Sequence, residues 1–221
     1  MNNYEIETDE YLTHGLKLFL CARLGETEKE HSEKYHQFIG FKKSSTVVDM
    51  GCGIGEMGRL LHKCDETLNI FNVTNSPRQC EIAKQLGSHC VLADFHATGL
   101  PSGIAQYVMF NESFGYGDPK QLLQEAARLL SDGGWVVLRD FSPNTPLEQV
   151  HASSWDYKCY PMHEVIAAAA QARLALLWMK RPKFLYAHYK QFFQSSAKMQ
   201  TWHSDDYQRY GDSYLTVLVK V

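Results

Sequence analysis

The stretch that most constrains this chain is residues 47–58, which read VVDMGCGIGEMG. An apolar, β-branched run predicts a buried strand that ends at Asp49, and a helical pattern follows from residue 56 to residue 63. Between them lie three alternating glycines, Gly51, Gly53 and Gly55. Glycine lets the backbone adopt a positive φ and approach a ligand closely. A strand, an acid, a glycine turn and a helix in this order predict a nucleotide-shaped pocket.

The pattern of two apolar residues, an aspartate and alternating glycines resembles the first motif of the class I S-adenosylmethionine (SAM) dependent methyltransferases. In that family the glycine turn lies under the methionine part of SAM, and the acid orders the turn and the amino group. The resemblance implies an α/β fold, with a seven-stranded Rossmann-like sheet and helices on both faces. It also implies SAM as the cofactor and places Asp49, Gly51, Cys52 and Gly53 in the cofactor site.

Two other interpretations of the glycine turn deserve comparison. Gly53, Gly55 and Gly58 also satisfy G-x-G-x-x-G, the dinucleotide fingerprint. A dehydrogenase of that type needs an acid about 20 residues further on for the ribose hydroxyls, but the next predicted strand ends in Thr74 and Asn75. A turn whose glycines serve only packing is disfavoured because alternating glycines carry a large entropic cost. The methyltransferase interpretation therefore fits best.

Short β-branched runs alternate with helical patterns along the chain, which is typical of a parallel sheet covered on both faces. The expected strands lie near residues 46–49, 68–73, 89–92, 105–111, 134–141, 174–180 and 213–221. We expect the glycines at 133 and 134 to end the apolar helix over residues 122–130. The last strand is expected to be antiparallel and inserted beside the sixth, as in the methyltransferase fold.

Two segments do not belong to this minimal fold, although the whole chain, 1–221, is expected to form one domain. Residues 1–40 have a helical pattern and are predicted to form an N-terminal cap. Residues 182–212 interrupt the last two strands and are rich in aromatic side chains. In this family such additions cover the acceptor pocket, so we expect both segments, together with residues 143–160, to form a lid. The alternative is that the aromatic residues only anchor an inserted helix on the core.

Composition narrows the class of protein. The 221 residues are 44% hydrophobic, enough to bury the core of one domain. A net charge of −3 gives no general attraction to phosphate backbones, so no nucleic-acid partner is expected. The chain starts without a basic region and apolar core, and polar residues interrupt its longest apolar run, 165–179. We therefore expect a cytoplasmic protein with no membrane span.

The cysteines and histidines give no sign of a metal site. The six cysteines include no C-x-x-C pair, and the ten histidines form neither H-x-x-x-H nor H-E-x-x-H. Such spacings are what zinc sites require. We therefore expect reduced thiols and no bound metal.

Residues 72–79, NVTNSPRQ, narrow the resemblance. They look like the G-V-T-x-S-x-x-Q pattern of the cyclopropane fatty acid synthase and terpenoid (prenyl diphosphate) C-methyltransferase group, with Asn72 in place of the glycine. By that resemblance Thr74 and Gln79 hydrogen-bond the ribose hydroxyls of SAM in place of a carboxylate, and Asn75 lies beside them.

The ends of the third and fourth strands carry the remaining candidates for cofactor binding. Asp94 and Phe95 follow the third strand, where the family contacts adenine. Asp94 can accept a hydrogen bond from the N6 amino group, and Phe95 can cover the ring. Asn111, at the end of the fourth strand, is also assigned to the cofactor site.

Glu112 is the main candidate for the acceptor chemistry. The N-E-S sequence at 111–113 is similar to that of the prenyl diphosphate C-methyltransferases, in which the glutamate faces the reacting alkene. Methylating an alkene leaves a carbocation, so the site must stabilise positive charge and then remove a proton. A carboxylate can do both, and aromatic rings such as that of Tyr116 can add cation–π stabilisation. Alternatively, Glu112 anchors SAM or the lid.

We therefore expect a SAM-dependent methyltransferase that acts on a small-molecule acceptor, at an alkene or another activated carbon. Two alternatives stay open. One is N- or O-methylation of a small metabolite, with the base to be sought among Tyr116, His151, His163, Tyr186 and His188. The other is a SAM-binding accessory protein without turnover. No aspartate pair or arginine cluster suited to magnesium diphosphate is evident, and the strand-four end lacks the N-P-P-Y motif of aminomethyltransferases. The sequence leaves homo-oligomerisation open.

Overall fold

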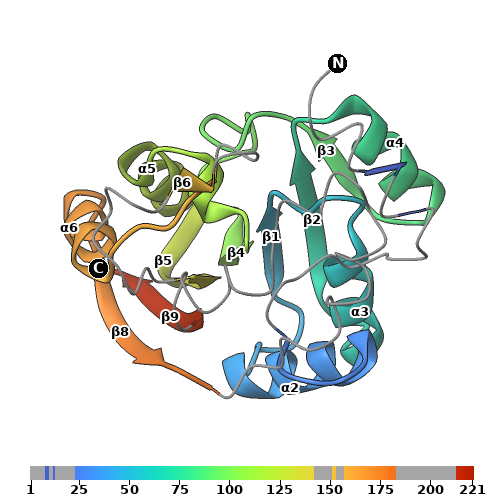
Figure 1. Cartoon of the computed structure of the whole chain (residues 1–221), viewed down its shortest axis with the longest axis horizontal. Helices are drawn as coiled ribbons and strands as arrows, with labels where there is room; N and C mark the ends of the chain where they lie inside the picture. The colour runs from blue at the N-terminus through green and yellow to red at the C-terminus, as the bar shows by residue number, and fades with distance from the viewer. Residues whose placement is uncertain (1–7, 10–11, 13–22, 142–150, 153–156, 183–212) are drawn as a thin grey trace.

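A seven-stranded mixed sheet forms the centre of the molecule (Figure 1). The computed structural model describes residues 8–9, 12, 23–141, 151–152, 157–182 and 213–221. The strand order is β3-β2-β1-β4-β5-β9-β8. The strands are β1 (Thr46–Met50), β2 (Asn69–Thr74), β3 (Cys90–Leu92), β4 (Ala105–Asn111), β5 (Leu130–Phe141), β8 (Leu174–Lys180) and β9 (Ser213–Lys220). The first five are parallel, and β9 is antiparallel to both of its neighbours. The predicted methyltransferase sheet is confirmed.

Helices cover both faces of this sheet. They are α2 (Glu28–Ile39), α3 (Glu56–Cys64), α4 (Pro77–Gln85), α5 (Pro119–Leu129) and α6 (Met162–Gln171), with a short 3-10 helix, η1 (Phe114–Tyr116). A two-stranded hairpin of β6 (His151–Ala152) and β7 (Tyr157–Lys158) completes the described part. Side-chain oxygens cap several helices at their first turn. The Ser76 hydroxyl accepts from the backbone N–H of Gln79, and the Asp118 carboxylate accepts from the backbone N–H groups of Lys120 and Gln121.

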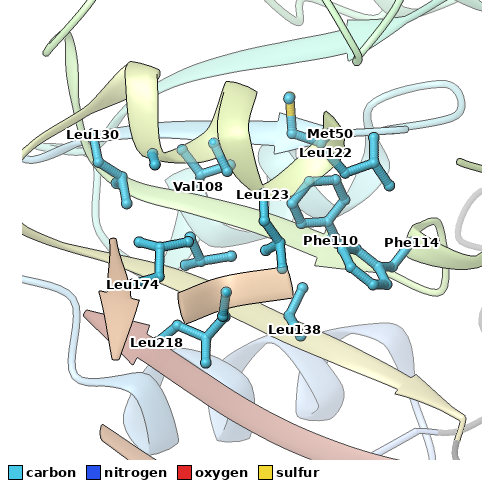
Figure 2. Close-up of a cluster of buried hydrophobic side chains, with 14 of the residues drawn as sticks. Met50, Val108, Phe110, Phe114, Leu122, Leu123, Leu130, Leu138, Leu174 and Leu218 are labelled. Carbon is cyan, nitrogen blue, oxygen red and sulfur yellow. The ribbon is translucent and has the colours of Figure 1, made fainter. Parts of the chain in front are cut away.

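Two separate cores hold the helices on the sheet. On one face, Tyr35 and Ile39 of α2 pack with Met57 and Leu61 of α3 against the strands. On the other face, α5 and α6 pack over β4, β5 and β9, and Figure 2 shows this cluster of leucine, valine and phenylalanine side chains. Strands buried on both faces explain the continuous apolar runs of the central strands.

One strand boundary differs from the prediction. The strand expected at 134–141 begins at Leu130, immediately after α5, so glycine does not end the helix. Leu130 is fully buried and pairs with Ala105, which draws the chain into the sheet at once. The register then shifts before Tyr107 pairs with Trp135, and Gly133 takes a positive φ of 70° in between. The glycines therefore serve a bulge inside the strand rather than a helix end.

The segments expected to form a lid are only partly described. Residues 183–212 and most of 142–156 lie outside the described residues, so these predictions stay untested. At the described end of the second segment, Tyr157 and Cys159 are buried in the core, and the Tyr160 hydroxyl donates to the Gly117 carbonyl at 3.0 Å. Among the helices that the structure describes, none is long and apolar enough to cross a membrane.

Candidate active site

The glycine turn after β1 is hydrogen-bonded to β2. The backbone N–H groups of Gly51 and Cys52 both donate to the Val73 carbonyl, at 2.9 and 3.0 Å. Gly51 and Gly53 have φ values of 78° and 56°. A Cβ at Gly51 would lie 2.5 Å from the Cβ of Ser113, whereas a Cβ at Gly53 would meet no atom within 4 Å. Gly51 is therefore needed for packing, and Gly53 borders open space in which a ligand can approach the backbone.

Asp49 lies buried at the end of β1, beside Asn111 at the end of β4. Burial raises the pKa of the Asp49 carboxyl to about 7, and the nearby Asn111 amide partly offsets that effect. The side-chain nitrogen and oxygen of Asn111 are themselves buried, and neither has a hydrogen-bond partner among the described residues. Buried polar atoms in folded proteins are almost always paired, so this amide and carboxyl together mark a position that a polar ligand group can complete.

The Cys52 side chain, on the glycine turn, contacts other residues of the protein. Its thiol donates to the Gly53 carbonyl at 3.3 Å and packs against Cys80 and Cys90. Hydrogen bonds from the neighbouring thiols, with that of Cys52 first, lower the pKa of Cys90 to about 7. All cysteines in the described part are free thiols, as expected. The thiol and N–H of Cys52 are thus both engaged within the protein.

Thr74 and Gln79, the residues predicted to bind ribose, are in direct contact. The Thr74 hydroxyl donates to the Gln79 side-chain oxygen at 2.9 Å, and both residues are buried. The Gln79 amide nitrogen also donates to the Thr8 hydroxyl at 3.1 Å. The N-terminal segment therefore reaches this site, a contact 71 residues apart in sequence that no local pattern could reveal. Asn75, by contrast, is exposed.

Asp94 and Phe95 lie at the end of β3 and reach the same turn from another side. Phe95 is buried and approaches the position of a Gly51 Cβ to 3.7 Å. His96 binds the Asp94 carboxylate through its backbone N–H and its ring nitrogen, at 2.8 and 2.7 Å. Partial burial opposes ionisation of Asp94, but the two bonds from His96 outweigh it and lower its pKa. Both bonds end on Oδ1, which leaves Oδ2 to accept from an amino group.

Glu112 follows β4 and is held in place by β5. Its N–H donates to the Arg139 carbonyl at 2.8 Å, and its carboxylate accepts from the Arg139 guanidinium at 2.8 Å. Both side chains are nearly inaccessible, with exposures of 7% and 0%. The backbone of Glu112 has a φ of 52°, a conformation that residues other than glycine rarely adopt. Such strain persists only where the surroundings enforce it, and it clusters at functional sites.

A second acidic group, absent from the predicted set, lies beside this pair. Asp140 is buried at the end of β5 and accepts a short hydrogen bond from the Tyr157 hydroxyl. The Tyr157 ring stacks edge-on with Tyr116, with centroids 4.7 Å apart. The predicted Tyr116 is therefore brought to the acidic cluster, whereas His188 lies outside the described residues. The polar pair Arg139-Asp140 ending the apolar run WVVL was the available sequence signal.

Comparison with known proteins assigns the chain to a family. Residues 24–205 match the sequence profile of a family described as a methyltransferase domain. The chain belongs to this family. The description of this family agrees with the prediction, made from the glycine motif, of a methyltransferase fold with SAM as its cofactor.

The individual relatives have low sequence identity to this chain. The chain is 31% identical over 118 residues to the 2-methyl-6-phytyl-1,4-hydroquinone methyltransferase of Synechocystis, covering 51% of this chain and 36% of that protein. The chain thus spans about a third of the length of this relative. A sarcosine dimethylglycine methyltransferase structure from Galdieria sulphuraria has a TM-score of 0.79 at 14% identity, covering 97% of this chain and 98% of that one. The geranyl diphosphate C-methyltransferase of Streptomyces coelicolor has a TM-score of 0.73 at 18% identity, covering 100% and 98%.

The residues at the carboxyl ends of β1 to β4 fit SAM. The open space beside Gly53 suits a close approach to the backbone, and the buried Asn111 amide with Asp49 suits the amino group of the methionine part. Phe95 offers an apolar face and Asp94 an acceptor for an adenine ring. No group of three or more potential metal ligands occurs within the described ranges.

Replacing Gly53 with alanine should weaken SAM binding because the added methyl group enters the open space of the turn. The matched control is Gly103→Ala, since Gly103 has a similar φ of 71° and equally open surroundings in the loop before β4. Both variants carry the strain of a left-handed alanine, about 1 kcal/mol, so only the effect on SAM separates them. Titration calorimetry of both proteins measures this. Equal SAM affinities for the two would place the methionine part elsewhere.

Gln79→Ala should weaken SAM binding by about 1 kcal/mol, or roughly fivefold, the contribution of one hydrogen bond to a buried ribose hydroxyl. Thr8→Val is the control, because it removes the other partner of the Gln79 amide and keeps the side-chain volume. If binding depends on Gln79 only through its contact with Thr8, both variants lose affinity equally in calorimetry. A ribose contact predicts a loss in Gln79→Ala alone.

Proposed function

We propose that this methyltransferase transfers a methyl group from SAM to a carbon atom of a small molecule, an alkene or an electron-rich ring. The observation that carries the proposal is the acidic cluster at the carboxyl ends of β4 and β5, where Glu112 and Asp140 lie beside one arginine, Arg139. Among the residues that the structure describes, two carboxyl groups against one guanidinium give an excess of negative charge when both are ionised. That excess suits an acceptor on which positive charge develops as the new carbon–carbon bond forms.

The residues of the chain divide into two groups under this proposal. Asp49, Asn111, Thr74 and Gln79 hold the cofactor, whose chemical contribution is an electrophilic methyl group on a sulfonium. Arg139 fixes the Glu112 carboxylate at the end of β4, so its charge costs little reorganisation during the reaction. The ring of Tyr116 lies edge-on to that of Tyr157 and offers an aromatic surface to a cationic carbon.

The relatives support carbon as the acceptor atom without naming the substrate. One structural neighbour is a geranyl diphosphate C-methyltransferase, and a curated relative methylates a phytyl hydroquinone. Another neighbour is named as a methyltransferase for sarcosine and dimethylglycine, which are amines. N- or O-methylation of a small metabolite is therefore the alternative.

Incubation with isotopically labelled SAM separates these activities. The acceptors are a prenylated hydroquinone, geranyl diphosphate with magnesium, and sarcosine. Carbon methylation predicts release of S-adenosylhomocysteine (SAH) and a carbon-bound methyl group by NMR of the product. A methyl group on nitrogen or oxygen would replace the proposal with its alternative. SAM binding by calorimetry without SAH release for any acceptor would indicate an accessory protein without turnover.

A further inference from the structure

Of the two carboxyl oxygens of Asp140, only one has hydrogen-bond partners among the described residues. Its Oδ1 accepts from the Tyr157 hydroxyl and from the Phe141 N–H, the latter at 2.7 Å. Its Oδ2 is buried and has no hydrogen-bond partner in the described part of the chain. The side chain is 3% exposed. A buried carboxyl oxygen without a partner is expensive to maintain, so Oδ2 is available to a group that the described residues do not supply.

The charged and titratable groups that the structure describes around Asp140 lie on β5 and β9, at the end of β4, and on or just after β7. Arg139 precedes it on β5, and Glu112 approaches from the end of β4. Tyr157 donates from β7, and the electrostatic influence of Asp140 extends to Cys159, which follows β7. Tyr214 is its register partner on β9, fully buried beside it. Arginine is thus the one cation in this described set, and the other groups are acids, phenols and a thiol.

The two carboxyl groups differ in how they are held. Glu112 forms a buried ion pair with Arg139, with the oxygen and nitrogen 2.8 Å apart. Asp140 forms no ion pair of this kind with the other described residues. Burial raises its pKa to about 7, although the bond from Tyr157 partly lowers it. A base is most effective when its pKa lies near the working pH, so Asp140 is suited to exchange a proton.

We propose that Asp140 accepts the proton that the acceptor loses during methyl transfer, with Tyr157 positioning its carboxylate, while Glu112 and Arg139 remain a fixed ion pair. This inference rests on the proposed carbon methylation. The acceptor carbon gains a methyl group and a neighbouring C–H bond breaks. The electron pair of that bond restores the double bond, and the proton passes to Asp140 Oδ2. The methyl group leaves its sulfonium, whose sulfur keeps the bonding pair as SAH forms.

The pH dependence of turnover tests the assignment. In the wild-type protein, turnover should fall as the pH drops through about 7, because a protonated Asp140 cannot accept a proton. Asp140→Asn keeps the shape and the Tyr157 contact, and should lower turnover about 100-fold and abolish this acidic limb. Tyr157→Phe removes the bond that stabilises the carboxylate, so the limb should move to higher pH. Asp132→Asn, at the exposed opposite end of β5, is the control and should behave as wild type.

A second measurement needs neither SAM nor an acceptor. Infrared difference spectra of wild type minus Asp140→Asn should show a protonated carboxyl band that disappears as the pH rises through neutrality. The difference removes the contribution of Asp49, which is buried in both proteins. Absence of this band, or an acidic limb that persists unchanged in Asp140→Asn, would overturn the inference. If wild type turns over none of the acceptors, the proposed function fails and the infrared titration alone decides the protonation of Asp140.

Discussion

Replacing Glu112 with glutamine should lower turnover by about 100-fold or more and leave SAM affinity nearly unchanged. Glutamine keeps the shape of the side chain and removes the negative charge that is fixed at the end of β4 by Arg139. A lost electrostatic contact to a developing positive charge has an effect of this size. Release of SAH under saturating SAM measures turnover, and calorimetry measures SAM affinity.

The matched control for this experiment lies outside the site. Glu125 and Arg128 form another ion pair with a buried glutamate, at 2.7 Å on α5. Glu125→Gln removes one charge from that pair, so it reports what a lost ion pair does to turnover through stability alone. If Glu112→Gln and Glu125→Gln are equally active at a temperature where both are folded, Glu112 has a structural role. The base for an N- or O-methylation would then be sought elsewhere.

Arg139→Met should destabilise the protein by about 3–5 kcal/mol, the usual effect of removing one partner from a buried ion pair. Arg139 is the largest fully buried side chain described, and its loss leaves the Glu112 carboxylate buried without its cation. Urea denaturation followed by circular dichroism gives the free energy of unfolding.

A double variant separates the ion pair from the volume of the arginine side chain. Adding Glu112→Leu to Arg139→Met removes the stranded charge, so part of the lost stability should return. If the double variant is no more stable than Arg139→Met, packing of the arginine rather than its charge stabilises the sheet at this point. Glu112→Leu alone provides the fourth corner of the comparison.

The fold could be predicted from sequence because its signals are local. The glycine turn, the apolar runs of the parallel strands and the helical spacing over residues 122–130 each depend on neighbours in the chain. The start of β5 was misplaced because the burial of Leu130 depends on its pairing with Ala105, 25 residues away, which outweighs the tendency of glycine to end a helix.

The candidate site could be predicted only in part, because several of its contacts join residues that are distant in the sequence. Asp49 and Thr74 lie at the carboxyl ends of β1 and β2, and Phe95 follows β3, so the topology brings them to one edge of the sheet. The partners that fix the chemistry come from register and from distant segments. Arg139 meets Glu112 because β4 and β5 pair side by side, with Asn111 opposite Arg139. Thr8 reaches Gln79 from the N-terminal segment, a contact for which the sequence contains no signal.

The position of β9 bears on the order in which the two halves of the site mature during synthesis. β9 lies between β5 and β8, and it pairs Ser213 with Phe141 and Tyr214 with Asp140. The strands that carry the glycine turn need no residue beyond β4 for their mutual pairing. The wall around Asp140 is complete only after β9 has left the ribosome and entered the sheet. Because chains fold from the N-terminal side as they emerge, the strands around the glycine turn can pair before the strand that lines Asp140 has been synthesised.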